Sequence, residues 1–260
     1  MKKYLLLGTS LIVASSAYAA FDCTKIPTCA DLGYLQTKEQ CTGKNMLKCP
    51  FETDKVFCTG ESSGGNAGTG QGCDAVGDVL YSDLNCYEPL DKIASGVEPI
   101  AVVFDVDNKL AVALNDAPSR MAWASVTKDT PLPNYATEEE ALAAKETGKE
   151  NTATLIALGG DYASSDYAPG YCYNLTEGGQ PVGSWFLPSA RELRAMYDNK
   201  TTLNTALTNV EGSKLTESIY WSFSEYESET AWSIFMINGK LYGTNHYKDA
   251  GSYVRCAIAY

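Results

Sequence analysis

Two periods of hydrophobic positions divide the C-terminal 188 residues into strands and helices. Short apolar runs bounded by turn residues predict strands at 79–81, 100–106, 110–114 and 185–187. Helical spacing behind capping residues predicts one helix after Thr137 and another from Ser189 to Asn199, with further helical spacing over 151–158 and 201–210. Helices in the middle of the segment and antiparallel strands around them predict an α+β fold.

The last 42 residues return to strand periodicity, at 219–223, 231–237, 240–244 and 253–259. Asn238-Gly239 predicts a two-residue hairpin turn, which would pair Ile237 with Lys240 and Phe235 with Tyr242. Side chains alternate across a sheet, so one face would be core (Trp232, Ile234, Met236 and Leu241). Ser233, Phe235, Tyr242 and Thr244 would share the other face.

The N-terminus has the pattern of a secretory signal. Lys2-Lys3 precede a short apolar run over 4–14, and Ala17-Tyr18-Ala19 is a small-x-small cleavage pattern, so we expect the mature chain to begin at Ala20. The run is shorter than the roughly 20 residues that span a bilayer, and no later run is longer. We therefore predict an extracytoplasmic protein (secreted, periplasmic or at the cell surface) without a transmembrane segment.

The cysteines divide the exported chain into modules. Five of the nine fall between residues 23 and 58, in a stretch with few large apolar residues, and export favours disulfides over metal ligands. Residues 59–72 have the Gly/Ser-rich composition of a linker. The expected order is a signal peptide (1–19), a Cys-rich module (20–58), a linker (59–72) and a main domain (73–260).

Charge and histidine content narrow the function. The net charge of −12 becomes −14 once Lys2 and Lys3 are removed, and acids and bases balance in 20–58, so the negative charge lies downstream. This argues against nucleic acid and other polyanions as partners. The single histidine, His246, leaves no pair for a zinc site and no spare base for a Ser-His-Asp site. We expect no enzyme activity, no cofactor and no metal, and we interpret Asp105-Val-Asp107-Asn108 as a hairpin turn rather than a calcium site.

Five short motifs follow one another through the main domain. They are Gly183-Ser-Trp-Phe-Leu-Pro-Ser189 with Arg191-Glu192-Leu193, then Tyr220-Trp221-Ser222, Ala231-Trp232 and Val254-Arg255-Cys256. This series resembles the Lcl-type C-terminal domain of exported bacterial adhesins, which is similar to C-type lectin-like folds and to the formylglycine-generating-enzyme fold. The resemblance implies a compact domain with a ligand surface on a small antiparallel sheet.

The sequence lacks the pair of cysteines that the resemblance to formylglycine-generating enzymes would require for catalysis. Formylglycine-generating enzymes use two closely spaced cysteines, whereas here Cys256 is the only cysteine after Cys172. We expect a Cys172–Cys256 disulfide instead, which would stabilise the fold by roughly 4–5 kcal/mol on the chain-entropy model. Cys73 and Cys86 are expected to form a second disulfide at the entry to the domain.

A second, narrower resemblance concerns residues 242–253. This segment is almost wholly Tyr, Gly, Asn, Ser, Thr, Asp and His, and is similar to the variable region of diversity-generating-retroelement target proteins. Tyrosine supplies stiff contact area, and Ser, Gly and Asn supply adaptable hydrogen bonds. An ordinary polar loop is the alternative. The predicted ligand-binding residues are Ser233, Phe235, Tyr242, Thr244, Asn245, His246, Tyr247, Asp249, Ser252 and Tyr253.

These features together predict an exported binding or adhesion protein whose partner is a protein or a neutral glycan. Lcl-type domains are associated with sulfated glycans, but a domain this acidic should repel them. One alternative is a structural envelope protein cross-linked through the Cys-rich module. The other is an enzyme related to the formylglycine fold.

Overall fold

The computed structural model describes residues 72–87, 91, 93–125 and 129–260 with their side chains, and the backbone strands at 36–37, 44–48 and 55–61. The predicted signal peptide lies outside the described residues. The chain divides into two compact units, Met1–Gly64 and Gly65–Tyr260. The division falls within the stretch that was expected to be a linker.

The first unit contains a small antiparallel sheet. Its strands are β1 (Gln36–Thr37), β2 (Lys44–Lys48) and β3 (Lys55–Glu61), in the order β1-β3-β2. β3 continues to Glu61, three residues into the predicted linker. The cysteine pairings of this module lie outside the described side chains, so they stay a prediction.

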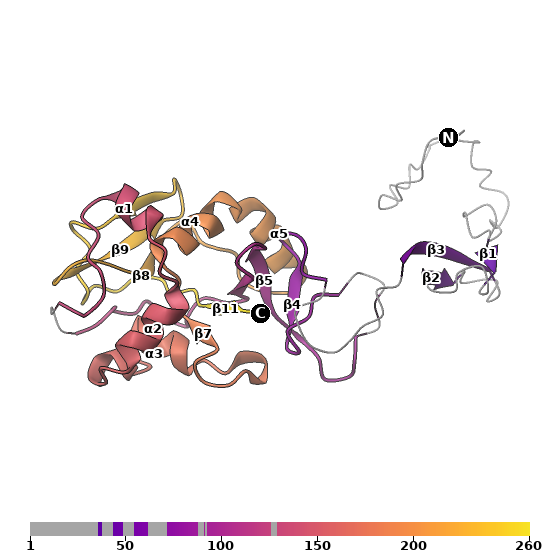
Figure 1. Ribbon diagram of the computed structural model, residues 1–260, viewed down its shortest axis with the longest axis horizontal. Coiled ribbons are helices and arrows are strands. Elements are labelled where there is room, and N and C mark those ends of the chain that lie inside the picture. Colours follow the sequence, from indigo (N-terminus) through magenta and orange to yellow (C-terminus); the bar gives the residue numbers. More distant parts are fainter. Residues whose placement is uncertain are drawn as a thin grey trace, which may run out of the picture. The chain divides into compact units, whose positions relative to one another are not determined.

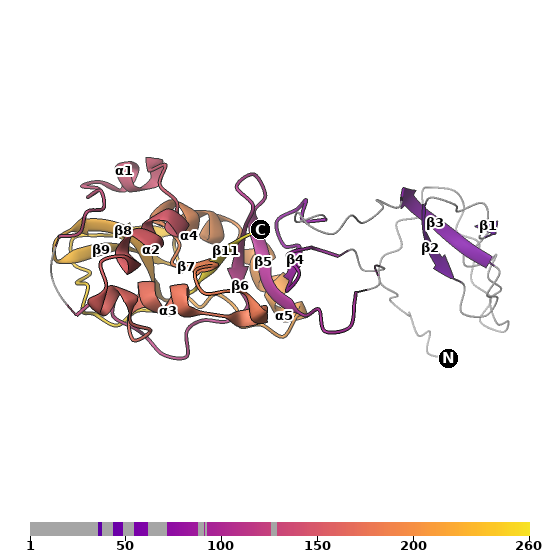
Figure 2. The same cartoon turned by 60° about the horizontal axis from the view of Figure 1, so that its bottom comes forward.

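The second unit is built around a five-stranded antiparallel sheet. Its strands are β4 (Val79–Tyr81), β5 (Pro99–Asp105), β6 (Leu110–Ala113), β7 (Trp185–Phe186) and β11 (Ala257–Ala259). The order is β4-β5-β6-β11-β7, so the C-terminal strand inserts between β6 and β7 (Figure 2). The predicted final strand, 253–259, is shorter than expected. At the β5–β6 turn, the Asp105 carboxylate accepts hydrogen bonds from the Asn108 main chain and amide, which confirms the hairpin-turn interpretation.

A second sheet of three strands follows. β8 (Ile219–Glu227), β9 (Thr230–Phe235) and β10 (Lys240–Tyr242) pair antiparallel in the order β10-β9-β8. The predicted hairpin register was wrong by two residues, because Lys240 pairs with Phe235 and Tyr242 with Ser233. Met236 continues along β8, where its N–H donates to the Ser218 carbonyl at 2.9 Å, so the chain turns over residues 236–239. A shift of two residues preserves the predicted faces.

Helices cover both sheets, and most begin at a capping residue. They are α1 (Glu138–Ala143), α2 (Gly148–Ile156), α3 (Ala168–Asn174), α4 (Ala190–Asp198) and α5 (Lys200–Asn209), with short 3-10 helices η2 (Gly160–Ala163) and η3 (Glu177–Gly179). The predicted caps Thr137 and Ser189 are confirmed. In both views α4 lies between β5 and the β8–β9 strands, against which it packs (Figures 1 and 2).

Glu192 joins two helix starts. Its carboxylate accepts from the Ser189 N–H at 2.8 Å, which completes the capping box of α4, and also from the N–H of Gly148, the first residue of α2. A Cβ at Gly148 would lie 2.3 Å from the Leu187 carbonyl, so this approach requires glycine. Burial raises the pKa of Glu192, the cost of placing a carboxylate between two helices.

Two hydrophobic clusters form the interior of this unit. One contains Trp123, Trp185 and Trp221, and the other contains Trp232 with the inward residues of α4 and α5. The prediction that Trp185, Trp221 and Trp232 are core residues is confirmed. The structure also contains the disulfides Cys73–Cys86 and Cys172–Cys256, as expected.

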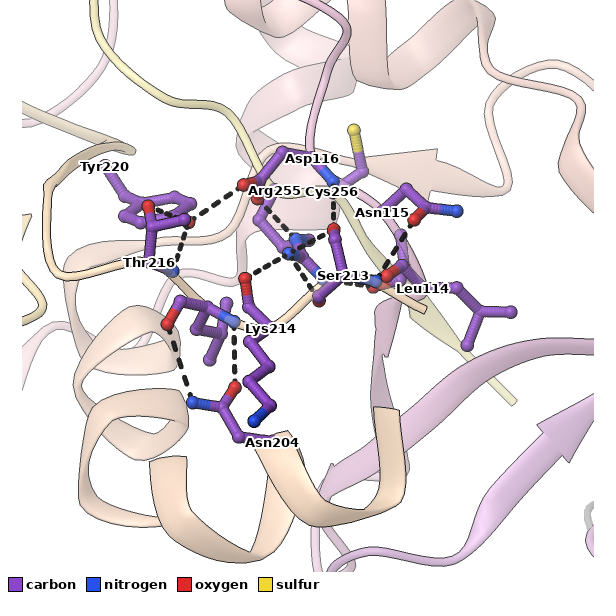
Figure 3. Close-up of polar contacts among 12 residues, drawn as sticks. Leu114, Asn115, Asp116, Asn204, Ser213, Lys214, Thr216, Tyr220, Arg255 and Cys256 are labelled. Carbon is purple, nitrogen blue, oxygen red and sulfur yellow. Dashed lines mark hydrogen bonds and ion pairs between the residues drawn. The ribbon is translucent and has the colours of Figure 1, made fainter. Parts of the chain in front are cut away.

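A buried arginine joins three distant segments. The Arg255 side chain has no exposed surface, and its Nε donates to Asp116 at 2.6 Å. Its two terminal nitrogens donate to the Ser213 hydroxyl and to the carbonyls of Ala113, Leu114, Ser213 and Lys214 (Figure 3). The Tyr220 hydroxyl donates to the other Asp116 oxygen at 3.0 Å. The Val-Arg-Cys motif of the resemblance is therefore a structural element here.

Candidate functional site

The β8–β9–β10 sheet has one face that is only partly covered. Cross-strand partners share a face, and the register aligns Ile219 with Phe235 and Lys240, and Trp221 with Ser233 and Tyr242. The opposite face carries Tyr220, Ile234 and Leu241, all buried. We call the side defined by Ile219, Trp221, Ser233, Phe235, Lys240 and Tyr242 the open face.

The exposed part of the open face is aromatic with one cation. The Phe235 and Tyr242 rings lie 6.4 Å apart in a T-shaped contact, and Lys240 Nζ lies 5.4 Å from the Tyr242 ring centroid. Tyr242 is 37% exposed, and Phe235 and Ile219 are half-buried. Ser233 is buried below them, and its hydroxyl donates to the Tyr242 carbonyl at 3.3 Å. Ser233 thus supports the strand pair and is not available to a ligand.

His246 extends this face beside β8. Its ring meets Trp221 edge-on at 4.0 Å between centroids, and its Nε2 lies 2.7 Å from the Ser252 hydroxyl. Burial lowers the pKa of His246 to about 4, so the imidazole is neutral at physiological pH. A neutral ring packed on tryptophan offers an aromatic surface and a weakly polar edge, without positive charge.

The loop after β10 distributes the remaining predicted residues over different surfaces. Thr244, Asn245 and Asp249 are exposed. Tyr247 is 50% exposed and pairs with Thr230. The Thr230 side chain is on the face of β9 opposite to Ala231 and Ser233. Tyr247 therefore lies on the side opposite the open face.

Two more predicted residues do not face solvent on the open face. Ser252 is buried at 3% exposure and bonds His246. Tyr253 pairs with Tyr220, their rings 5.4 Å apart, and the Arg120 guanidinium lies 5.1 Å from the Tyr253 ring centroid. The structure thus brings Phe235 and Tyr242 into contact and places His246 against Trp221, whereas Tyr247 and Tyr253 lie elsewhere.

Sequence reasoning missed two residues of the open face, Ile219 and Lys240. The strand alternation contained the signal for both, since a partner of Phe235 on either neighbouring strand must share its face. It also missed Lys248, which is fully buried and paired with Glu225. A lysine in a polar loop gives no indication of burial.

Metal sites and surface grooves are the other places where the described part of the chain could bind a ligand. No group of three or more His, Cys, Asp or Glu side chains within it is placed to hold a metal ion. A surface groove of about 450 Å³ lies along α5, lined by Lys200, Lys214 and polar side chains of that helix. None of the described helices is both long and apolar enough to cross a membrane.

Comparison with known proteins relates this fold to a solved structure. No protein-family model and no curated protein matches the chain. Its structure is similar to the crystal structure of a fimbrial protein from Bacteroides ovatus, with a TM-score of 0.54 and 15% sequence identity. The match covers 72% of this chain and 49% of that chain, so the chain spans about half the length of the fimbrial protein. At this identity the likeness concerns the fold alone.

Proposed function

We propose that this is an exported, non-enzymatic binding or adhesion protein whose ligand surface is the open face of the β8–β9–β10 sheet. The observation that carries the proposal is the contiguous set of Phe235, Tyr242 and Lys240 on a sheet held by a buried core. Aromatic residues are enriched at protein interfaces, and stiff tyrosines bind at low entropic cost. The Lcl-type and C-type lectin-like resemblance agrees with this placement.

The architecture favours binding over catalysis. Cys172 and Cys256 are bonded to each other and buried, so neither offers the free thiol that a formylglycine-type reaction needs. The histidine beside the open face has its pKa lowered to about 4 by burial, too low for a general base matched to neutral pH. The fold likeness to a fimbrial protein is consistent with a role at the cell surface.

The partner class is a protein or a neutral glycan. The chain carries a net charge of −12, which disfavours polyanions, and the exposed part of the open face consists of the Phe235 and Tyr242 rings beside Lys240. Exposed aromatic rings suit a protein partner or the apolar face of a sugar ring.

The test uses two tyrosines of comparable exposure on opposite sides of the sheet. The full mature chain and its Tyr242→Ala and Tyr247→Ala variants would be applied to an array of surface proteins and neutral glycans. We expect Tyr242→Ala to weaken the strongest signal at least tenfold, as loss of a central contact does. Tyr247→Ala, the matched control, should stay within about twofold. Equal signals from all three proteins would reject the open face as the site.

A further inference from the structure

Residues 246–248 form an extended segment along the start of β9. Tyr247 pairs with Thr230, the Ala231 N–H donates to the His246 carbonyl at 3.3 Å, and the Lys248 N–H donates to the Glu229 carbonyl at 2.9 Å. Side chains alternate along such a segment, so His246 and Lys248 point to one side and Tyr247 to the other. The exposed Tyr247 is thus flanked by two residues that anchor the loop.

The Lys248 side chain is the deeper of the two anchors. It has no exposed surface, and its ammonium group pairs with the equally buried Glu225 carboxylate. It also donates to the Ser228 carbonyl at 2.8 Å and lies 5.0 Å from the Trp123 ring centroid. The Lys248 carbonyl accepts from the N–H groups of Trp123 and Ala124, at 2.7 and 3.0 Å.

A buried ion pair holds both of its members in place. If Lys248 withdrew toward solvent, the Glu225 charge would stay buried, and among the described side chains the Thr130 hydroxyl is the partner it would keep. Breaking such a pair is strongly unfavourable, because one charge remains uncompensated in a medium of low dielectric constant. The loop therefore has one stable position while both charges are present.

His246 depends on that position. It is two residues before Lys248, and its contacts with Trp221 and Ser252 need the loop to lie against the sheet. We infer that the Lys248–Glu225 pair is a latch that positions His246 against Trp221 and so completes the proposed ligand face. Only the ligand-binding role rests on the proposed function, since the latch is a property of the loop itself.

The single histidine of the chain makes the latch measurable without any ligand. The probe is the His246 imidazole, titrated by NMR in histidine-labelled full-length mature protein carrying a tag without histidine. In the wild type we expect a pKa of about 4. In Glu225→Gln we expect it to rise by at least one unit toward the ordinary value of about 6.5, because a released loop exposes the ring.

Simple electrostatics predicts the opposite sign for this variant. Removing the Glu225 carboxylate leaves positive charge near the histidine, which on its own would lower the pKa further. The double variant Glu225→Gln/Lys248→Met removes both charges and should return the pKa to near 4, because the methionine can stay buried. Lys240→Met, which removes an exposed lysine of the same sheet, is the control and should leave the pKa unchanged.

The inference is overturned if the pKa of His246 in folded Glu225→Gln is unchanged or lower. If that variant does not fold, Glu225→Gln/Lys248→Ala replaces it. This variant leaves no buried charge and removes the anchoring side chain, so the pKa of His246 should rise although the methionine variant stays near 4, and an unchanged pKa rejects the latch.

Binding to the strongest array probe separates the latch from the proposed function. Glu225→Gln should weaken that signal at least fivefold, and the double variant should restore it. If wild type binds no probe but the pKa responds as expected, the proposed function fails and the latch stands. If Tyr242→Ala abolishes binding while the pKa of His246 stays unchanged in Glu225→Gln, the proposed function stands and the latch fails.

Discussion

Two fully buried cations of this domain do different work, although each pairs with a carboxylate. Arg255 lies beside the C-terminal strand and makes six hydrogen bonds to five residues in two other segments. Lys248 lies in a surface loop, and its partners among the described residues include the Glu225 carboxylate and the Ser228 carbonyl. The arginine crosslinks the framework, whereas the lysine fixes one loop.

The chemistry of the two side chains explains the difference. The guanidinium group is a rigid fork with five N–H donors, so it can satisfy several backbone carbonyls at once. The ammonium group is a compact charge that suits one carboxylate and an aromatic ring, here Glu225 and Trp123. Loss of Arg255 should therefore leave many backbone acceptors without this hydrogen-bond donor. Loss of both charges of the Lys248–Glu225 pair should be less destabilising.

The largest expected effect is that of Arg255→Lys. A lysine keeps the charge but has three donors, so at least three of the present hydrogen bonds are lost and buried acceptors remain unpaired. At about 1 to 1.5 kcal/mol for each bond, the free energy of unfolding should fall by roughly 3–5 kcal/mol. Urea denaturation of the oxidised protein measures it, and a loss below about 1 kcal/mol would show that the cluster does not hold the framework.

An intermediate effect on the free energy of unfolding is expected when both charges of one ion pair, Lys248–Glu225 or Arg255–Asp116, are removed together. Glu225→Gln/Lys248→Met should change the free energy of unfolding by less than about 1 kcal/mol, since a buried ion pair is often replaceable by uncharged side chains. The matched variant Asp116→Asn/Arg255→Met should lose more than about 2 kcal/mol, because four carbonyls each lose a hydrogen bond from the guanidinium. Comparable losses in the two double variants would contradict the comparison.

The smallest expected effect concerns how the stability of the protein changes with pH through His246, in the loop that Lys248 holds. Burial lowers the pKa of His246 from 6.5 to about 4, so below pH 6.5 the unfolded chain takes up a proton that the folded chain refuses. The stability contributed by the neutral ring is therefore lost as the pH falls from 6.5 toward 4. We expect His246→Gln to gain about 1 kcal/mol on the wild type across that range, a discounted value because the ring is partly exposed.

The raised pKa values of Glu192 and Glu225 increase stability as the pH falls, which is the opposite direction. Both glutamates are present in the wild type and in His246→Gln, so their contributions cancel in the difference between the two proteins. Melting temperatures of the two proteins measured at matched pH give that difference. A constant gap between pH 7 and 4 would show that His246 is not packed against Trp221 in solution.

Local patterns predicted much of the fold of the second unit. The capping boxes, the strand periodicity and the faces of the hairpin depend on neighbours a few residues apart, so they were recoverable from the chain alone. The second capping box, at Thr147, had the same Thr-x-x-Glu pattern and could have been found. The hairpin register was not recoverable, because the position of Met236 against β8 overrode the Asn-Gly turn.

The candidate site was predicted less completely than the fold. Phe235 and Tyr242 are in contact because strand alternation places them on one face, and His246 packs against Trp221 of that face. Tyr247 was misplaced beside them, because the loop pairs with the start of β9 through long-range hydrogen bonds that composition does not encode. Ser252 and Ser233 were chosen for their chemistry, and burial removes both from the surface.

The chain by itself determines its α+β character, the starts of the helices capped at Thr137 and Ser189 and its two inward faces, because these follow from local sterics and the spacing of apolar residues. Tertiary contacts alone set which polar residues reach solvent. Arg255 and Lys248 look like ordinary surface cations in the sequence, and each is buried because a carboxylate more than 20 residues away meets it there. A buried charge without its partner is strongly unfavourable, so each ion pair is stable only when both members are in place. For this reason the Arg255–Asp116 pair fixes the framework and the Lys248–Glu225 pair fixes the loop.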